Sequence, residues 1–449
     1  MSITVIKTIQ KGTERLTAVR QTHLKKDHFN IEANLIVLFP EAPQQEIEGF
    51  GGAFTEAASV TLDKLSPAKR HQVMRAYFDP DEGIGYHFCR THIGSCDFAV
   101  DPYTHIEEGD KTLATFSLER DRKSLIPMIK EAMAMADVRL FASPWSPPAF
   151  MKSNNKRWGG GKLLPEYYDL WADYFKRYIQ EYKKEGIPIW AVTAQNEPNA
   201  AQTWESCAYT AQEECDFIKN HLGPCMADMD VKLLCWDHNK ERLFERAQTI
   251  LSDPDAAKYV WGVAFHWYSG DHFEQIDLLS RLYPGKKLAF TEGCRDTKTQ
   301  GPKMKKGWDI AESYAHDIIG NFNNGCSIFT DWNMILDEKN GPYHQRAPFI
   351  YCDAPIIINT KKDEIIYEPS YYYIGHFSKY VRRGAKRIVA SRFTDKLQVL
   401  AFVNPDGTVV CVVLNRTNDK IGYALKMNGK LAHLKSEAHS ITTLLINNE

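Results

Sequence analysis

Two glutamates stand at the ends of apolar segments, where a carboxylate could act as an acid, a base or a nucleophile. Glu197 closes the run WAVTAQNE at 190–197, and Glu292 closes KLAFTE at 287–292. Such runs are typical of strands that are covered on both faces. Pro198 cannot donate to a strand ladder, so it predicts that the first strand ends at Glu197. The alternatives are structural: a loop acid or helix N-cap at Glu197, and acids paired with Arg or Lys at both positions.

Two carboxylates that face each other suit the hydrolysis of a glycosidic bond. One protonates the leaving oxygen, and the other attacks the anomeric carbon or activates a water. A separation of about 5 Å gives retention of configuration, and about 6.5–9.5 Å gives inversion. The two glutamates are 95 positions apart, which is about three strand–helix units of roughly 30 residues. We therefore expect them on strands four and seven of a barrel, converging from opposite sides of its C-terminal end.

Polar and aromatic residues follow the other expected strands. Indole rings stack on the faces of sugars, whereas Asp, Asn and His bind hydroxyl groups, so this mixture favours a carbohydrate pocket. A single Trp is more often part of a core, but several at one barrel end favour binding. The candidates are Arg90, Asp97, Trp145, Asn196, Asp237, His238, His266, Tyr268 and Trp332.

The sequence favours neither a metal site nor a cofactor. His266, Asp237 and His238 could be metal ligands, but the chain has no HExxH and no cysteine spacing of a zinc site. It has no GxSxG of a serine hydrolase. The glycines at 49–52 lack the GxGxxG spacing of a dinucleotide site. We expect no metal and no cofactor.

The middle of the chain alternates expected strands with expected helices. Eight such units predict an α/β fold with a (β/α)₈ TIM barrel, and a doubly wound open sheet is the alternative. One helix is expected over 66–77, with Ser66 as its N-cap and Pro67 in its first turn. The strands are expected at about 47–54, 84–92, 137–143, 188–194, 231–236, 261–267, 286–291 and 326–332. The other helices are expected at roughly 119–136, 165–186, 210–229, 240–252, 272–282 and 310–322.

Both ends of the chain contain short β-strand patterns. The first 40 residues show period-2 alternation. Apolar runs at 397–403 and 409–414 flank Asn404-Pro405-Asp406-Gly407, a strong hairpin turn. We expect the two ends to form one small β-sandwich. The predicted domains are N-terminal strands at 1–45, the barrel at 46–382 and the C-terminal part of the β-domain at 383–449.

The composition is that of a globular protein of moderate charge. The chain has 449 residues, 43% hydrophobic and 25% charged, with a net charge of −2. Without a long basic run, nucleic acid is not an expected partner. No apolar stretch is long enough for a transmembrane segment. The ten cysteines form no CxxC pair and are expected to be reduced and mostly buried. The N-terminus shows no secretory signal, so we expect a cytoplasmic protein unless a leader was trimmed or export follows another route.

Short stretches along the chain carry a resemblance to a known family. They are GFGGAFTEAA (49–58), GSCDF (94–98), ASPWSPPAFMK (142–152), WAVTAQNEP (190–198), FHWY (265–268), FTEGC (290–294), TDWN (330–333), NGP (340–342) and YIGHFSKYV (373–381). Together they resemble glycoside hydrolase family 30, specifically its glucosylceramidase-like branch. The resemblance implies a retaining mechanism with Glu197 as acid/base and Glu292 as nucleophile. It also implies that Asp97, Trp171, Asn196 and Trp332 contact the glycone, and that Arg90, His266 and Tyr268 support the nucleophile or the sugar.

The chain departs from the lysosomal members of this family. Their signal peptide and N-terminal disulfides are not visible in this sequence, so we expect that lysosomal biology does not transfer. The segments expected to bind the aglycone, at 153–164, 203–207 and 334–350, are the weakest part of the match. The motifs therefore indicate the chemistry better than the substrate.

The favoured function is that of an exo-β-glucosidase or glucosylceramidase-like enzyme acting on a β-glucoside. The alternatives are an endo-β-1,6-glucanase acting on a β-glucan and, behind it, a β-xylosidase or β-fucosidase. A sugar-binding or effector protein without catalysis is disfavoured because both glutamates are present. We expect nearby ionised Glu292 to keep Glu197 protonated in the free enzyme. We also expect Asn196 to bind the 2-hydroxyl of the sugar.

Overall fold

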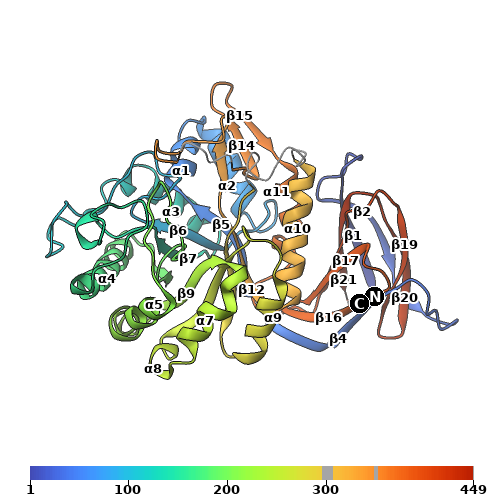
Figure 1. The fold of residues 1–449 in the computed structure, drawn as a ribbon. Helices are drawn as coiled ribbons and strands as arrows, with labels where there is room; N and C mark the ends of the chain where they lie inside the picture. Colours follow the sequence, from blue (N-terminus) through green and yellow to red (C-terminus); the bar gives the residue numbers. More distant parts are fainter. Residues whose placement is uncertain (296–306, 348–351, 448–449) are drawn as a thin grey trace.

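Eight parallel strands close into a barrel at the centre of the computed structural model, which describes residues 1–295, 307–347 and 352–447 (Figure 1). Because the sheet closes on itself, the predicted TIM barrel is confirmed and the open doubly wound sheet is excluded. The strands are β5 (Gly49–Phe54), β6 (Phe88–Ile93), β7 (Arg139–Pro144), β8 (Ile189–Thr193), β9 (Lys232–Asn239), β10 (Val260–His266), β11 (Lys287–Glu292) and β12 (Cys326–Asp331).

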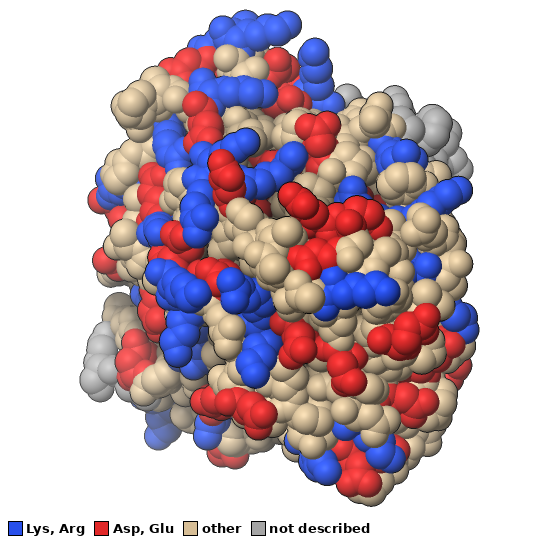
Figure 2. Space-filling view, turned by 90° about the vertical axis from the view of Figure 1, so that its left-hand side faces the viewer, with Lys and Arg blue, Asp and Glu red and all other residues tan. Residues whose placement is uncertain are grey.

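The helices surround this barrel (Figure 1). They are α1 (Glu56–Leu62), α2 (Pro67–Phe78), α3 (Leu125–Met135), α4 (Tyr168–Lys184), α5 (Ala211–Phe217), α6 (Gly223–Asp228), α7 (Leu243–Leu251), α8 (Pro254–Ala257), α9 (Phe273–Leu282), α10 (Trp308–Asn323) and α11 (Pro369–Ser378). No helix of the described segments is long and apolar enough to span a membrane. On the face drawn in Figure 2, Lys and Arg are interspersed with Asp and Glu.

Several helices differ in detail from the sequence prediction; the helix expected over 119–136, for example, begins only at Leu125. The helix expected over 210–229 is divided by a π-turn at Ile218–Leu222, next to Pro224, which has no N–H to continue the α-helical ladder. Ser66 precedes α2 as expected, but its hydroxyl does not cap the helix. It donates instead to Asp363 Oδ2 at 2.6 Å, and the Ser66 N–H donates to Asp363 Oδ1 at 2.9 Å.

Strands from both chain ends form the predicted β-sandwich beside the barrel (Figure 1). Its ten strands are hydrogen-bonded into one continuous sheet. The first and last strands pair directly, with registers from Ser2 opposite Asn447 to Ile9 opposite Ser440. The predicted hairpin connects β17 to β18, with Gly407 at a φ of 84°. The strands are β1 (Ser2–Ile9), β2 (Thr17–His23), β3 (Lys25–Lys26), β4 (Leu35–Glu46), β16 (Lys386–Arg392), β17 (Leu397–Val403), β18 (Val409–Asn415), β19 (Ile421–Met427), β20 (Lys430–Ser436) and β21 (Ser440–Asn447).

Helix α11 connects the sandwich to the barrel through a buried histidine. His376 contacts the hydroxyls of Thr8 at 2.9 Å and Thr443 at 2.8 Å, so one ring joins β1 and β21. Burial lowers the pKa of His376 to about 3, and the ring is therefore neutral at ordinary pH. A small sheet of β13 (Ile335–Asp337), β14 (Ile356–Asn359) and β15 (Glu364–Tyr367) follows the last barrel strand.

The barrel interior is divided along its axis. Its lower layer, on the side away from the C-terminal ends of the strands, is apolar. Seven strands each contribute one inward-facing side chain to it, and the glycine-rich β5 contributes none. Branched and aromatic side chains packed in this way close the barrel. The seven residues are Phe88, Phe141, Ala191, Leu234, Ala264, Ala289 and Ile328.

Candidate active site

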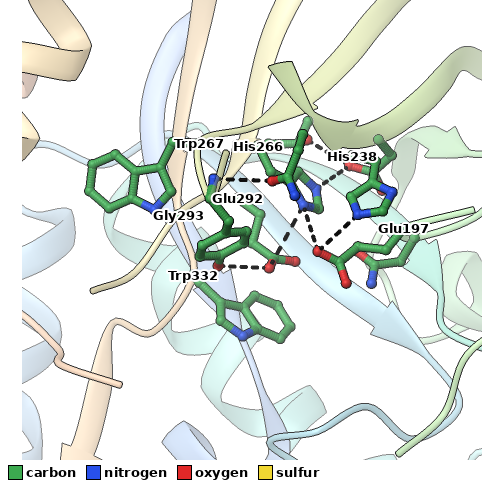
Figure 3. Close-up of polar contacts among 12 residues, drawn as sticks. Glu197, His238, His266, Trp267, Glu292, Gly293 and Trp332 are labelled. Carbon is green, nitrogen blue, oxygen red and sulfur yellow. Dashed lines mark hydrogen bonds and ion pairs between the residues drawn. The ribbon is translucent and has the colours of Figure 1, made fainter. Parts of the chain in front are cut away.

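Glu197 and Glu292 meet beside His266 at the C-terminal end of the barrel (Figure 3). Each of the three residues has one nitrogen or oxygen that could bind a metal ion, and these three atoms lie within 4.8 Å of one another. These three residues are therefore also where a cation could bind. Both Glu292 oxygens already accept hydrogen bonds from protein groups, however, so we assign no metal.

Glu292 ends β11 as predicted, and its carboxylate is held at both oxygens. Arg90 donates to Oε2 at 2.7 Å, and the Tyr268 hydroxyl donates to Oε1 at 2.9 Å. Burial raises the pKa of Glu292, while the positive charges of His266 and Arg90 oppose that rise. These contacts fix the carboxylate in one orientation.

Arg90 also orients a second predicted residue. Its fully buried guanidinium donates to Asn196 Oδ1 at 2.8 Å. Because the oxygen of this amide is occupied, its NH₂ group remains available to donate to a sugar hydroxyl.

Asp237 is the centre of the hydrogen-bond network below the two glutamates. Its carboxylate is fully buried, and donors on five other strands surround it at 2.6–3.1 Å. Burial alone would raise the pKa of Asp237, but the charges of Arg90 and His266 outweigh it and hold the pKa well below its usual range. The donors are Arg90, Ser143, Thr193, His266 and Thr291.

A β-bulge in β9 brings Asp237 into the barrel. Strand alternation would place Trp236 inward, two positions after Leu234. Instead the pairing with β10 shifts by one residue, from Ala264 opposite Trp236 to Phe265 opposite His238. Trp236 and Asp237 have φ values of 73° and 53°, which cost on the order of 1–2 kcal/mol each. The extra residue turns the carboxylate, rather than the indole, toward the site.

The turn that carries Glu197 differs from the prediction. Strand β8 ends at Thr193, so Glu197 is not at the strand tip. It lies in a turn with a φ of 47°. Its N–H donates to the Asp237 carbonyl at 3.0 Å, and the N–H of Asn196 donates to the Pro144 carbonyl at 2.8 Å. Pro198 lies beyond this turn and therefore does not end the strand.

Two imidazole rings change the expected proton distribution. His266 Nδ1 lies 3.4 Å from Glu197 Oε1, and His238 Nε2 lies 3.7 Å from the same oxygen. Burial alone would lower the pKa of His266, but Glu292, Asp237 and Glu197 raise it to about 9. Burial alone would raise the pKa of Glu197, but His238, His266 and Gln202 lower it to about 2.

The prediction that Glu292 keeps Glu197 protonated is therefore wrong for the unliganded site. It considered the charge of Glu292 but not the two histidines, which come from β9 and β10. The raised pKa of His266 favours a proton on this ring, which contacts Glu197. The position of His266 at the end of a strand was visible in the sequence, but its distance from Glu197 was not.

Two stacked indoles form one wall of the site. The rings of Trp145 and Trp332 lie 5.0 Å apart at 19°, and the Arg90 guanidinium lies 4.9 Å from the Trp145 ring. Trp332 Nε1 donates to Asp97 Oδ2 at 3.4 Å, while Asp97 Oδ1 is buried and has no hydrogen-bond partner among the described residues. Burial, together with Glu292 and Glu197, raises the pKa of Asp97 well above its usual range. Asp97 thus offers a polar oxygen to a ligand hydroxyl.

Trp171 does not join the other predicted sugar-binding residues. It lies on α4, where its ring packs against Tyr174 at 4.8 Å and Phe175 at 5.1 Å. Its position in a helix with an apolar face accounts for this burial. Trp145 occupies the place beside Trp332 where an indole was expected.

The loops expected to bind the aglycone are connected to one another. Glu205 is buried and contacts His344 at 2.9 Å and Ser95 at 2.5 Å. Burial would raise the pKa of Glu205, but His344 and Ser95 lower it. Thr203 donates to the Arg346 carbonyl at 2.8 Å. Hydrogen bonds therefore hold the loops after β6, β8 and β12 to one another. Positions 348–350 of the predicted loop lie outside the described residues.

Comparison with known proteins gives a consistent match over nearly the whole chain. Residues 47–381 match the glycosyl hydrolase family 30 TIM-barrel domain, and 384–444 match the family's β-sandwich domain. Lysosomal acid glucosylceramidase of Mus musculus is 37% identical over 86% of this chain and 78% of its own. An endo-1,6-β-D-glucanase of Aspergillus fumigatus is 27% identical over 90% of this chain and 85% of its own.

Two solved structures match the chain over its full length. SrfJ from Salmonella typhimurium superimposes with a TM-score of 0.95 at 36% identity, with complete coverage of both chains. An endo-β1,6-glucanase superimposes with a TM-score of 0.89 at 28% identity, again with complete coverage of both.

Proposed function

The chain belongs to glycosyl hydrolase family 30 and is a glycoside hydrolase, and we propose that it cleaves β-linked glucosides by a retaining double displacement. The observation that carries this proposal is the spacing of the carboxylates. Oxygens of Glu197 and Glu292 lie within 4.8 Å of each other. Retaining enzymes place their two carboxyl groups about 5 Å apart, and inverting enzymes leave a wider gap for water.

In the first step Glu292 attacks C1 of the glucoside while Glu197 protonates the leaving oxygen. Arg90 and Tyr268 orient the attacking carboxylate. The proton is shared between His266 Nδ1 and Glu197 Oε1, which lie 3.4 Å apart. It moves onto Glu197 as the leaving oxygen approaches. The C1–O bond breaks, and a glucosyl ester of Glu292 forms.

In the second step Glu197 acts as the base. It takes a proton from a water that attacks C1 of the ester, and the C1–O bond to Glu292 breaks to release β-glucose. The Asn196 amide, held by Arg90, binds the 2-hydroxyl and stabilises the transition state. Asp97, Trp145 and Trp332 bind the remainder of the glucose ring.

The favoured substrate is a glucoside cleaved from its non-reducing end. The connected loops around Glu205 and His344 support this proposal, because loops held to one another restrict the site more than an open cleft would. The relative named lysosomal acid glucosylceramidase also supports it. Endo-β-1,6-glucanase action is the second candidate, favoured by the full-length likeness to an enzyme of that name.

Product analysis separates these functions. The purified protein is incubated with gentiobiose, a linear β-1,6-glucan, glucosylceramide and an aryl β-xyloside, and the products are followed by NMR. We expect β-glucose as the first-formed anomer, released from glucosides one unit at a time. Oligosaccharides from the glucan would establish the endo alternative, and first-formed α-glucose would contradict the retaining mechanism.

A further inference from the structure

A buried ion pair lies outside the group of residues that would contact the substrate. Glu214 on α5 is fully buried, and Arg246 on α7 is 2% exposed. Arg246 donates to Glu214 Oε2 at 3.1 Å. Taking two charges out of water costs free energy, and apolar side chains of similar size often stabilise a fold at least as well. Stability alone therefore does not explain why an ion pair is present here.

We propose that Glu214, together with Arg246, positions the acid/base Glu197 against the nucleophile by holding both segments on which Glu197 depends. The inference rests on the proposed role of Glu197 in leaving-group protonation. Glu214 does not contact the substrate in this proposal, and it acts only through the backbone of the active site.

The first segment is the bulge in β9. The Trp236 N–H donates to Glu214 Oε1 at 2.7 Å. This N–H belongs to one of the two bulge residues with positive φ, and the next residue, Asp237, gives its carbonyl to the Glu197 N–H at 3.0 Å. Removing the acceptor would strand a buried N–H and release the strained backbone.

The second segment is the turn of Glu197 itself. Arg246 donates to the Tyr209 carbonyl at 3.0 Å, and the Tyr209 N–H donates to the Pro198 carbonyl at 2.8 Å. The Arg246 guanidinium also lies 4.7 Å from the Trp236 ring. The pair therefore holds the residue after Glu197 and the residue before Asp237 at the same time.

Nothing in this arrangement requires a full negative charge on Glu214. Burial raises its pKa, and Arg246 opposes that rise. The essential feature is an oxygen that accepts from Trp236, and a glutamine retains this oxygen. Glu214→Gln should therefore preserve function, whereas Glu214→Leu, of similar volume, should not.

The test compares two aryl β-glucosides whose leaving groups differ in their need to be protonated by an acid. Phenyl β-glucoside requires an acid, and 2,4-dinitrophenyl β-glucoside does not. For Glu214→Leu we expect kcat/KM on the phenyl glucoside to fall at least about tenfold, with less than about a threefold change on the dinitrophenyl glucoside. Glu214→Gln should remain within about threefold on both substrates.

The matched control is Glu312→Leu, which removes another buried acid. Glu312 lies on α10 and contacts His439 of the sandwich at 2.8 Å, away from β9 and the Glu197 turn. A merely structural effect would reduce activity on both aryl glucosides alike, and Glu312→Leu should do no more than that. If Glu214→Leu does not fold, Arg246→Lys replaces it and should show the same leaving-group dependence.

Equal losses on both substrates, or equal losses in Glu214→Gln and Glu214→Leu, would overturn the inference. Glu197→Gln, measured in parallel, separates this result from a failure of the proposed function. If Glu197→Gln itself shows no leaving-group dependence, the acid assignment fails. If it does and Glu214→Leu does not, only the role of Glu214 fails.

Discussion

The lower and upper layers of the barrel interior are built from the same strands but have opposite chemistry. Each lower-layer residue is apolar, and two positions further along most strands the inward side chain is polar. Phe88 is followed by Arg90, Phe141 by Ser143, Ala191 by Thr193, Ala264 by His266, Ala289 by Thr291 and Ile328 by Thr330. On β9 the step from Leu234 to Asp237 is three, because of the bulge.

The difference separates what stabilises the barrel from what would perform the reaction. Folding removes the apolar side chains of the lower layer from water and packs them closely, which stabilises the barrel. The upper layer buries charges that are expensive to desolvate. The loop that follows β6 adds Asp97 Oδ1, a buried polar atom without a hydrogen-bond partner among the described residues. Polar groups left unpaired in this way are available to a ligand, so the upper layer favours binding over stability.

The largest effect should come from the nucleophile of the upper layer. Glu292→Gln should reduce kcat by at least about 10⁴-fold, because an amide cannot form the glycosyl ester. Steady-state hydrolysis of an aryl β-glucoside measures this loss, and a thermal melt shows whether the variant is folded. Substantial remaining activity would refute the nucleophile assignment.

A second change in the upper layer should affect only one class of substrate. Glu197→Gln should reduce kcat/KM on glucosides with poor leaving groups by about 10²–10⁴-fold. Glucosides with good leaving groups should still form the glycosyl-enzyme, which intact-mass spectrometry can detect. The same loss on both classes would count against Glu197 as the acid.

His266 should make the stability of the upper layer depend on pH. Its pKa is raised from 6.5 to about 9 on folding. The resulting stabilisation is complete below pH 6.5 and is lost as the pH rises through about 9. Between these values the free energy of unfolding should fall by about 2–4 kcal/mol more in the parent than in His266→Gln.

Urea denaturation at a series of pH values measures this difference. His71→Gln, at an exposed position on α2, is the matched control and should follow the parent. If His266→Gln and the parent showed parallel pH dependence, the imidazolium between the carboxylates would not exist at neutral pH.

The smallest effect should come from trimming the lower layer. Ile328→Val should reduce the free energy of unfolding by about 0.5–1.5 kcal/mol, with kcat changed less than about twofold. Thr330→Val, two residues further on the same strand, should not destabilise. Its buried hydroxyl has no partner among the described residues, and a methyl group replaces it. If Thr330→Val lowered the free energy of unfolding more than Ile328→Val, the division into two layers would be wrong.

The strands and the catalytic pair could be predicted because they depend on local patterns. Apolar runs of strand length mark most of the barrel strands, although β5 is rich in glycine and β6 contains Arg90 and His92, and Glu292 directly follows such a run. The turn at Glu197 was placed wrongly because Pro198 is a breaker that lies beyond the true end of β8. Trp171, whose role was implied only by the resemblance, lies outside the matching stretches, and its residue type does not reveal which face of a helix it occupies.

The sequence by itself determined the family, the barrel with its sandwich, and the two carboxylates that face each other. Periodicity and strand ends depend on neighbours in the chain, and these are written in the residues. Tertiary structure decided the rest. The bulge that turns Asp237 inward is held by a hydrogen bond to Glu214 on another element, and the pKa of His266 is raised because three carboxylates from different parts of the chain surround its ring. Proton affinity and backbone strain depend on charges and donors that only folding brings together.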